Sequence, residues 1–177
     1  LKGGGMYVEY RSDDARLTIE VLKTAVDKGA LCINYVEFSS FILNEKNIIN
    51  GAVCKDAFAE NELKIKAKKI INACGPWVDV LRKTDKSLSK KRLHLTKGIH
   101  IVLPNEKLPI RQAVYFDVKD GRMIFAIPRG KKVYIGTTDT NYTSDTNAPY
   151  ATKEDVIYLL NAANHMFPTV QLKMEDV

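Results

Sequence analysis

Residues 69–78 (KIINACGPWV) constrain the fold more than any other stretch of the chain. An apolar run of the strand type ends in small residues, continues through Gly75-Pro76, and leads into an apolar segment that can open a helix. Glycine lets the backbone approach a partner, and proline suits the first helical position, where no N–H is needed. The N–H groups that open such a helix favour an anionic guest. The stretch therefore predicts a strand-to-helix turn, which is either an ordinary turn of an α/β protein or part of a binding site.

Hydrophobic periodicity in the first half of the chain predicts a helix among strands. The helix begins at Asp13 or Asp14, buries Leu22, Ala25 and Val26 at the i, i+3, i+4 spacing, and ends at Gly29. Polar, turn-prone joints separate the apolar runs that follow, which is typical of an antiparallel meander. The expected strands are residues 6–10, 31–36, 37–43, 48–55, 63–67 and 68–73.

The second half of the chain predicts a short helix, a mainly antiparallel sheet and a final helix. Asp120-Gly121 is a dipeptide that tight hairpins prefer. Thr152 is a candidate N-cap for the final helix. The short helix is expected over residues 76–83, and the strands over residues 98–103, 113–118, 123–127 and 132–136. The predicted fold class is α+β.

Composition places the chain among cytosolic globular proteins of about one domain. It has 177 residues, 45% of them hydrophobic and 27% charged. No apolar run approaches the roughly 20 residues that span a bilayer. The start, LKGGG, shows neither an initiator methionine nor a signal peptide, so we interpret the chain as an internal piece of a longer protein. Cys32, Cys54 and Cys74 form no C-x-x-C pair and are expected to be reduced core thiols rather than disulfide or metal ligands.

The formal net charge of +6 is concentrated in one segment, residues 82–97. Basic side chains recur there against a single carboxylate, Asp85. Such a run is usually a solvated loop. The alternatives are contact with anionic lipid headgroups or with nucleic acid, and the latter is the weakest because no aromatic residue is interleaved for base stacking.

Three histidines are candidates for proton chemistry. His94 lies in the basic segment and is expected to be exposed, and His165 ends the last helix, where a cation complements the helix dipole. His100 lies within a strand, and alternation puts its side chain opposite Ile99 and Ile101. A lone histidine on a strand is more often structural than catalytic, because a pocket needs several convergent groups.

Four segments, in the same order, resemble FAD-dependent glycerol-3-phosphate dehydrogenases and oxidases of the D-amino-acid-oxidase-like flavoprotein superfamily. The most specific is residues 72–79 (NACGPWVD), which is similar to the family segment N-A-x-G-P-W-V. The others are residues 10–17 (YRSDDARL), 96–104 (TKGIHIVLP) and 124–139 (IFAIPRGKKVYIGTTD). Any one of them is a weak signal, but four collinear matches cover nearly the whole chain.

The resemblance implies a division into three parts. Residues 1–30 would form a substrate-domain strand and connecting helix. Residues 31–85 would form part of an FAD-binding, Rossmann-like layer with its meander, and residues 86–177 a substrate-binding sheet and helix. The implied cofactor is FAD, with Val36 near its adenine end. The turn at Gly75, Pro76 and Trp77 would pass near the diphosphate or ribityl region.

The resemblance also implies a role for the segment around His100. His100 would lie over the flavin and take the C2 hydroxyl proton of glycerol 3-phosphate as hydride leaves for the ring. Lys97 and Gly98 would approach the isoalloxazine ring, although Lys97 is equally consistent with a solvated member of the basic segment. Residues 136–139 (GTTD) either line the pocket or cap the following turn, and turn chemistry favours the cap.

The implied parent enzyme oxidises sn-glycerol 3-phosphate to dihydroxyacetone phosphate and passes electrons to a membrane quinone or to oxygen. It would be a homo-oligomer in the cytoplasm, peripheral on the inner face of the cytoplasmic membrane. The sequence has no G-x-G-x-x-G loop for the FAD diphosphate, so the piece alone is expected to be inactive and not to retain FAD. The alternatives are another flavoenzyme of the superfamily, acting on an amine or a 2-hydroxy acid, and a non-catalytic module that docks on anionic membrane.

Overall fold

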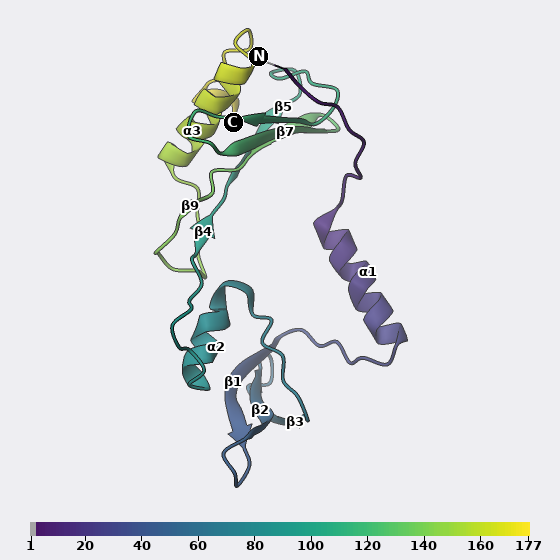
Figure 1. Cartoon of the computed structure of the whole chain (residues 1–177). Coiled ribbons are helices and arrows are strands. Elements are labelled where there is room, and N and C mark those ends of the chain that lie inside the picture. The colour runs from purple at the N-terminus through teal and green to yellow at the C-terminus, as the bar shows by residue number, and fades with distance from the viewer. Residues whose placement is uncertain (1–2) are drawn as a thin grey trace. The chain divides into compact units, whose positions relative to one another are not determined.

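The structure is a computed structural model, and it describes residues 3–177 (Figure 1). The described residues form two compact units, one ending at Ile71 and the other beginning at Asn72. The mixture of helices and antiparallel sheets confirms the predicted α+β class.

The first unit opens with helix α1 (Asp14–Asp27), as predicted. The Asp13 carboxylate caps it by accepting the Arg16 N–H at 3.1 Å, and Gly29 follows its end with a left-handed φ of 89°. The Arg16 side chain pairs with Glu20 at 3.0 Å. The expected burial of the apolar face is wrong for the described residues. Leu22 and Val26 are exposed, because no described element covers that face.

The meander of the first unit is confirmed. Strands β1 (Val36–Leu43), β2 (Ile49–Asp56) and β3 (Glu62–Lys66) form an antiparallel sheet in the order β1-β2-β3. Short-range hydrogen bonds stabilise its turns. The Asn44 side chain accepts the N–H groups of Lys46 and Ile48. The Asp56 carboxylate accepts the N–H of Phe58 at 2.8 Å, and this bond lowers the pKa of Asp56.

Three predicted strands are wrong in the described part of the chain. Residues 6–10, 31–35 and 68–73 have no strand conformation. A strand exists through hydrogen bonds to a neighbour, and none of the strand pairs formed by the described residues includes these segments. Their apolar side chains, such as Val8, Leu31 and Ile71, are exposed.

The second unit contains a larger sheet and most of the core. After the 3₁₀ turn η1 (Gly75–Trp77) and helix α2 (Val78–Thr84), strands β4 (Thr96–Lys97) and β9 (Thr140–Asn141) pair in a two-stranded sheet. Strands β5 (His100–Pro104), β6 (Val114–Asp117), β7 (Met123–Arg129) and β8 (Lys132–Gly136) form an antiparallel sheet in the order β5-β8-β7-β6. Helix α3 (Lys153–Met166) and the 3₁₀ turn η2 (Met174–Asp176) follow.

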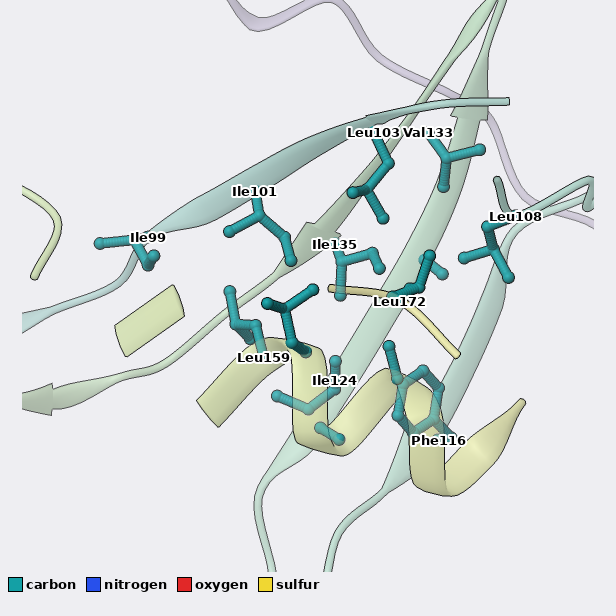
Figure 2. Close-up of a cluster of buried hydrophobic side chains, with 14 residues drawn as sticks. Ile99, Ile101, Leu103, Leu108, Phe116, Ile124, Val133, Ile135, Leu159 and Leu172 are labelled. Carbon is teal, nitrogen blue, oxygen red and sulfur yellow. The ribbon is translucent and has the colours of Figure 1, made fainter. Parts of the chain in front are cut away.

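One face of the four-stranded sheet packs on α3 (Figure 2). The sheet contributes Ile101, Leu103, Ile124 and Ile135, and α3 contributes Leu159, all almost fully buried. The predicted cap of α3 is confirmed, because Thr152 and Asp155 form a reciprocal capping box. Because α3 covers one face of the sheet, the opposite face is the one available for a binding site.

The expectation of core thiols is only partly right. Cys54 is buried, Cys74 is half-buried, and Cys32 is exposed, and all three are free thiols. No helix among residues 3–177 is both long enough and apolar enough to span a bilayer.

Candidate active site

The candidate site is the face of the four-stranded sheet opposite α3. Alternation from Ile99 into β5 buries Ile99, Ile101 and Leu103 and leaves the His100 side chain exposed on the other face. The predicted orientation of His100 is therefore confirmed. Val102, two residues further along the same face, is 49% exposed.

Two aromatic rings from β7 and β8 lie beside His100 on this face. Its imidazole lies 5.3 Å from the ring centre of Phe125 in β7 and 5.7 Å from that of Tyr134 in β8. Tyr115 in β6 extends the row, 5.9 Å from Phe125. We call these four residues the ring cluster. Its rings are tilted against one another, at interplanar angles from 38° to 82°, and they form a partly exposed aromatic surface on which a conjugated ligand can pack edge-to-face or offset. The imidazole adds a proton acceptor.

Gly136 makes room for the ring cluster. It pairs with His100 on one side and with Phe125 on the other, so the side chain of any other residue would lie between the two rings. A Cβ at Gly136 would collide with the His100 imidazole and with the Phe125 ring. The sequence does not reveal this role, because it depends on strand register.

Lys97, a predicted cofactor-binding residue, forms an ion pair and a hydrogen bond within the second unit. Its ammonium lies 2.5 Å from the Asp155 carboxylate and 3.0 Å from the Tyr150 carbonyl oxygen. The side chains of Lys97 and Asp155 are only 11% and 8% exposed, so the alternative of a solvated lysine is wrong. Burial acts to raise the pKa of Asp155, but bonds from Lys97 and Thr152 outweigh it and hold that pKa below its ordinary value.

Gly98, the next predicted residue, is required by local packing. A Cβ there would collide with the Thr137 hydroxyl. The Thr138 hydroxyl bonds to both neighbours of Gly98, since it donates to the Lys97 carbonyl and accepts the Ile99 N–H, each at 3.2 Å. Thr138 thus bonds to the segment before β5. This contact is different from the turn-capping role that the sequence favours for residues 136–139.

Arg122 holds Thr138 from the other side. Its guanidinium donates to the Thr138 carbonyl, pairs with the Asp120 carboxylate at 2.5 Å, and lies 4.0 Å from the ring centre of Tyr158 in α3. The Arg122 bond lowers the pKa of Asp120 to about 2. Thr138 is therefore linked, through Arg122, to the turn before β7 and to α3.

The turn at Gly75, Pro76 and Trp77 is confirmed on its helical side. Gly75 has a left-handed φ of 50°, which favours glycine, and Pro76 lies in the first helical turn. The Asn72 side chain braces the turn by donating to the Val78 carbonyl at 3.0 Å and accepting the Cys74 N–H at 3.3 Å. The Trp77 indole N–H donates to the Asn147 side chain at 3.1 Å.

The remaining candidates are not members of the ring cluster. Val36 begins β1 in the first unit. His94 is exposed, as predicted, and bonds to the Asn141 side chain at 2.8 Å. His165 lies in the last turn of α3, as predicted. Residues 3–177 contain no group of acidic, histidine or cysteine side chains that could hold a metal ion.

Comparison with known families decides the class of protein. The family model described as FAD dependent oxidoreductase (DAO) matches residues 1–177. The chain belongs to this family. The family resemblance seen in the sequence is confirmed.

Two curated relatives are similar to this chain along its whole length. The aerobic glycerol-3-phosphate dehydrogenases of Staphylococcus haemolyticus and Staphylococcus epidermidis are each 54% identical over 178 residues, which is 100% of this chain and 32% of theirs. A crystal structure of the glycerol-3-phosphate dehydrogenase of Bacillus halodurans, complexed with FAD, matches with a TM-score of 0.93 and 54% identity. The match covers 100% of this chain and 36% of the Bacillus halodurans chain. The chain therefore spans about a third of the length of these relatives.

Proposed function

We propose that this chain supplies the catalytic histidine and one wall of the substrate site to an FAD-dependent glycerol-3-phosphate dehydrogenase. The enzyme would oxidise sn-glycerol 3-phosphate to dihydroxyacetone phosphate. The observation that carries the proposal is the exposed His100 on an aromatic sheet face. The chain that presents it is 54% identical, along its whole length, to curated glycerol-3-phosphate dehydrogenases.

In the proposed mechanism His100 acts as a general base on the C2 hydroxyl of the substrate. FAD, when bound, would accept the hydride from C2. Phe125 and Tyr134 lie beside the imidazole. An imidazole suits this task, because histidine is the side chain that most often serves as a general base near neutral pH.

The described residues fit a flavin in their chemistry. The exposed parts of the ring cluster offer aromatic edges and faces to a planar ring system, and Val102 adds an apolar side chain on the same face of the sheet. Because the Lys97 ammonium bonds to Asp155, Lys97 and Gly98 would contribute through their backbone rather than through a free charge. The other proposed cofactor contacts are Val36, Gly75, Pro76 and Trp77.

Substrate choice tests the proposed function against its rival within the superfamily. Under anaerobic conditions, glycerol 3-phosphate is expected to bleach the flavin absorbance of the full-length enzyme, because hydride transfer reduces the ring. Sarcosine and 2-hydroxy acids, which lack the phosphate, are expected to leave it unchanged. Bleaching by an amine or a 2-hydroxy acid, with none by glycerol 3-phosphate, would reassign the enzyme to that rival.

The basic segment supports a membrane-surface role for the same enzyme. Arg82 is engaged by Asp79 at 2.8 Å, whereas Lys83, Lys86, Lys90 and Lys91 are exposed. Each lysine near an anionic surface contributes about 1 kcal/mol. Changing the four to glutamine therefore removes about 4 kcal/mol and is expected to lower the vesicle-binding constant about 10³-fold at low salt, measured by co-sedimentation with phosphatidylserine vesicles. Binding that neither salt nor the substitutions reduce would contradict this role.

The proposed whole protein has further features that rest on the family resemblance. It would pass electrons to a quinone or to oxygen and act as a homo-oligomer on the cytoplasmic face of the membrane. Its parts would divide near residues 30 and 85. The isolated 177-residue chain would be inactive and would not retain FAD.

A further inference from the structure

The main chain just before His100 lies between two sheets. The pairing of β4 with β9 ends at Lys97 and Thr140, and the pairing of β5 with β8 begins at His100 and Gly136. Gly98 and Ile99 therefore have no ladder partner in either described sheet. Glycine is also the residue with the greatest backbone freedom, so Gly98 is a natural pivot two residues before the imidazole.

The Thr138 hydroxyl restrains this pivot. It donates to the Lys97 carbonyl and accepts the Ile99 N–H, each at 3.2 Å, and so bonds to the residue on either side of Gly98. A hydroxyl has one donor and two acceptor positions, which makes both bonds compatible. The Thr138 side chain is 1% exposed, so water does not compete for them.

Thr138 is itself held in place. Arg122 donates to its carbonyl and is fixed by Asp120 and by the ring of Tyr158. Contacts therefore connect α3 to the Gly98 pivot: Tyr158 to Arg122, Arg122 to Thr138, and Thr138 to the residues on either side of Gly98. Small displacements matter at its end, because misplacing a catalytic group by about 1 Å can cost 10²-fold in rate.

We infer that Thr138 is a positioning residue for His100, acting through the main chain on either side of Gly98. The inference rests on the proposed function, since it gives Thr138 a part in the reaction only if His100 is the base. Thr138 would not contact the substrate. Its hydroxyl would set where the imidazole lies over the sheet.

Substituting Thr138 in the full-length enzyme tests this role. Thr138→Val keeps the shape and removes the hydroxyl, and it is expected to lower kcat about tenfold with KM and flavin content unchanged. The isotope effect of deuterium at C2 of glycerol 3-phosphate should rise, because chemistry becomes slower. Thr138→Ser keeps the hydroxyl and should restore kcat. Thr140→Val is the matched control, since the Thr140 hydroxyl reaches only the Lys97 carbonyl, at 3.4 Å.

A double-mutant cycle with His100→Ala separates positioning from general stabilisation. If Thr138 acts through His100, Thr138→Val should lower kcat no further when His100 is already alanine. Full additivity of the two losses would overturn the inference. If His100→Ala alone keeps normal turnover, the proposed function fails. If His100→Ala is impaired and Thr138→Val is not, only the positioning role fails.

Arg122→Met provides a second route if Thr138→Val does not retain flavin. It leaves the hydroxyl in place and removes the bond to the Thr138 carbonyl. A smaller loss of kcat in the same direction, absent in the His100→Ala background, supports the inference. Unchanged kcat in Arg122→Met would then overturn it.

Discussion

Replacing His100 by alanine is expected to lower the turnover of the full-length enzyme by about 10²–10⁴-fold, which is the usual contribution of a positioned general base. The imidazole is the member of the ring cluster suited to accept a proton near neutral pH, because histidine is the side chain most often used as a general base. The measurement is steady-state oxidation of glycerol 3-phosphate, expressed per mole of bound flavin so that loss of cofactor does not count as loss of catalysis.

His94→Ala is the matched control for this substitution. His94 is also exposed, but it bonds to Asn141 and lies outside the ring cluster. Its replacement should leave turnover close to that of the unmodified enzyme. Near-normal turnover of His100→Ala, with unchanged flavin content, would show that the imidazole is architectural and that another group removes the proton.

Elements built from short-range interactions could be predicted from the sequence. Helix α1 has its cap at Asp13 and its stop at Gly29, and α3 has the Thr152–Asp155 capping box. The meander follows from polar turns such as the one that Asn44 closes. In each case the residues that determine the structure lie within a few positions of each other, where single-sequence patterns are informative.

Elements that depend on distant partners could not be predicted in the same way. Residues 31–35 and 68–73 have strand-like sequences but no strand neighbour in the described chain, and the apolar face of α1 is uncovered. The chain spans about a third of the length of its relatives. Hydrophobic patterning indicates that a segment tends to pair as a strand or to be buried. Whether it does so depends on hydrogen bonds and packing contacts with segments distant in sequence, which the pattern does not specify.

The site shows the same division. Alternation placed His100 on the correct face, since that requires only period 2 along one strand. The roles of Gly136, Thr138 and Asp155 arise from contacts across the sheet and with α3, and the Lys97–Asp155 pair joins residues 58 positions apart. Such contacts follow from register and packing, which one sequence does not specify.

Replacing Lys97 by methionine is expected to weaken the second unit substantially. Lys97 and Asp155 are 11% and 8% exposed, so removing the ammonium leaves a largely buried carboxylate without its cation. Breaking such a pair costs about 3 kcal/mol, which corresponds to a factor of about 10². Hydrogen–deuterium exchange of the full-length protein should show amides in β5 and α3 losing about that much protection, because they open when the packing of α3 on the sheet fails.

Two companion variants identify the origin of that loss. Lys173→Met breaks an exposed pair, with Glu175 at 3.7 Å, and should leave protection unchanged because solvent already screens it. Combining Lys97→Met with Asp155→Asn removes both charges and should regain part of the lost protection, since the penalty comes from the unpaired carboxylate. If Lys97→Met alone leaves exchange unchanged, water must already solvate Asp155, and the pair holds neither α3 nor the segment that leads to His100.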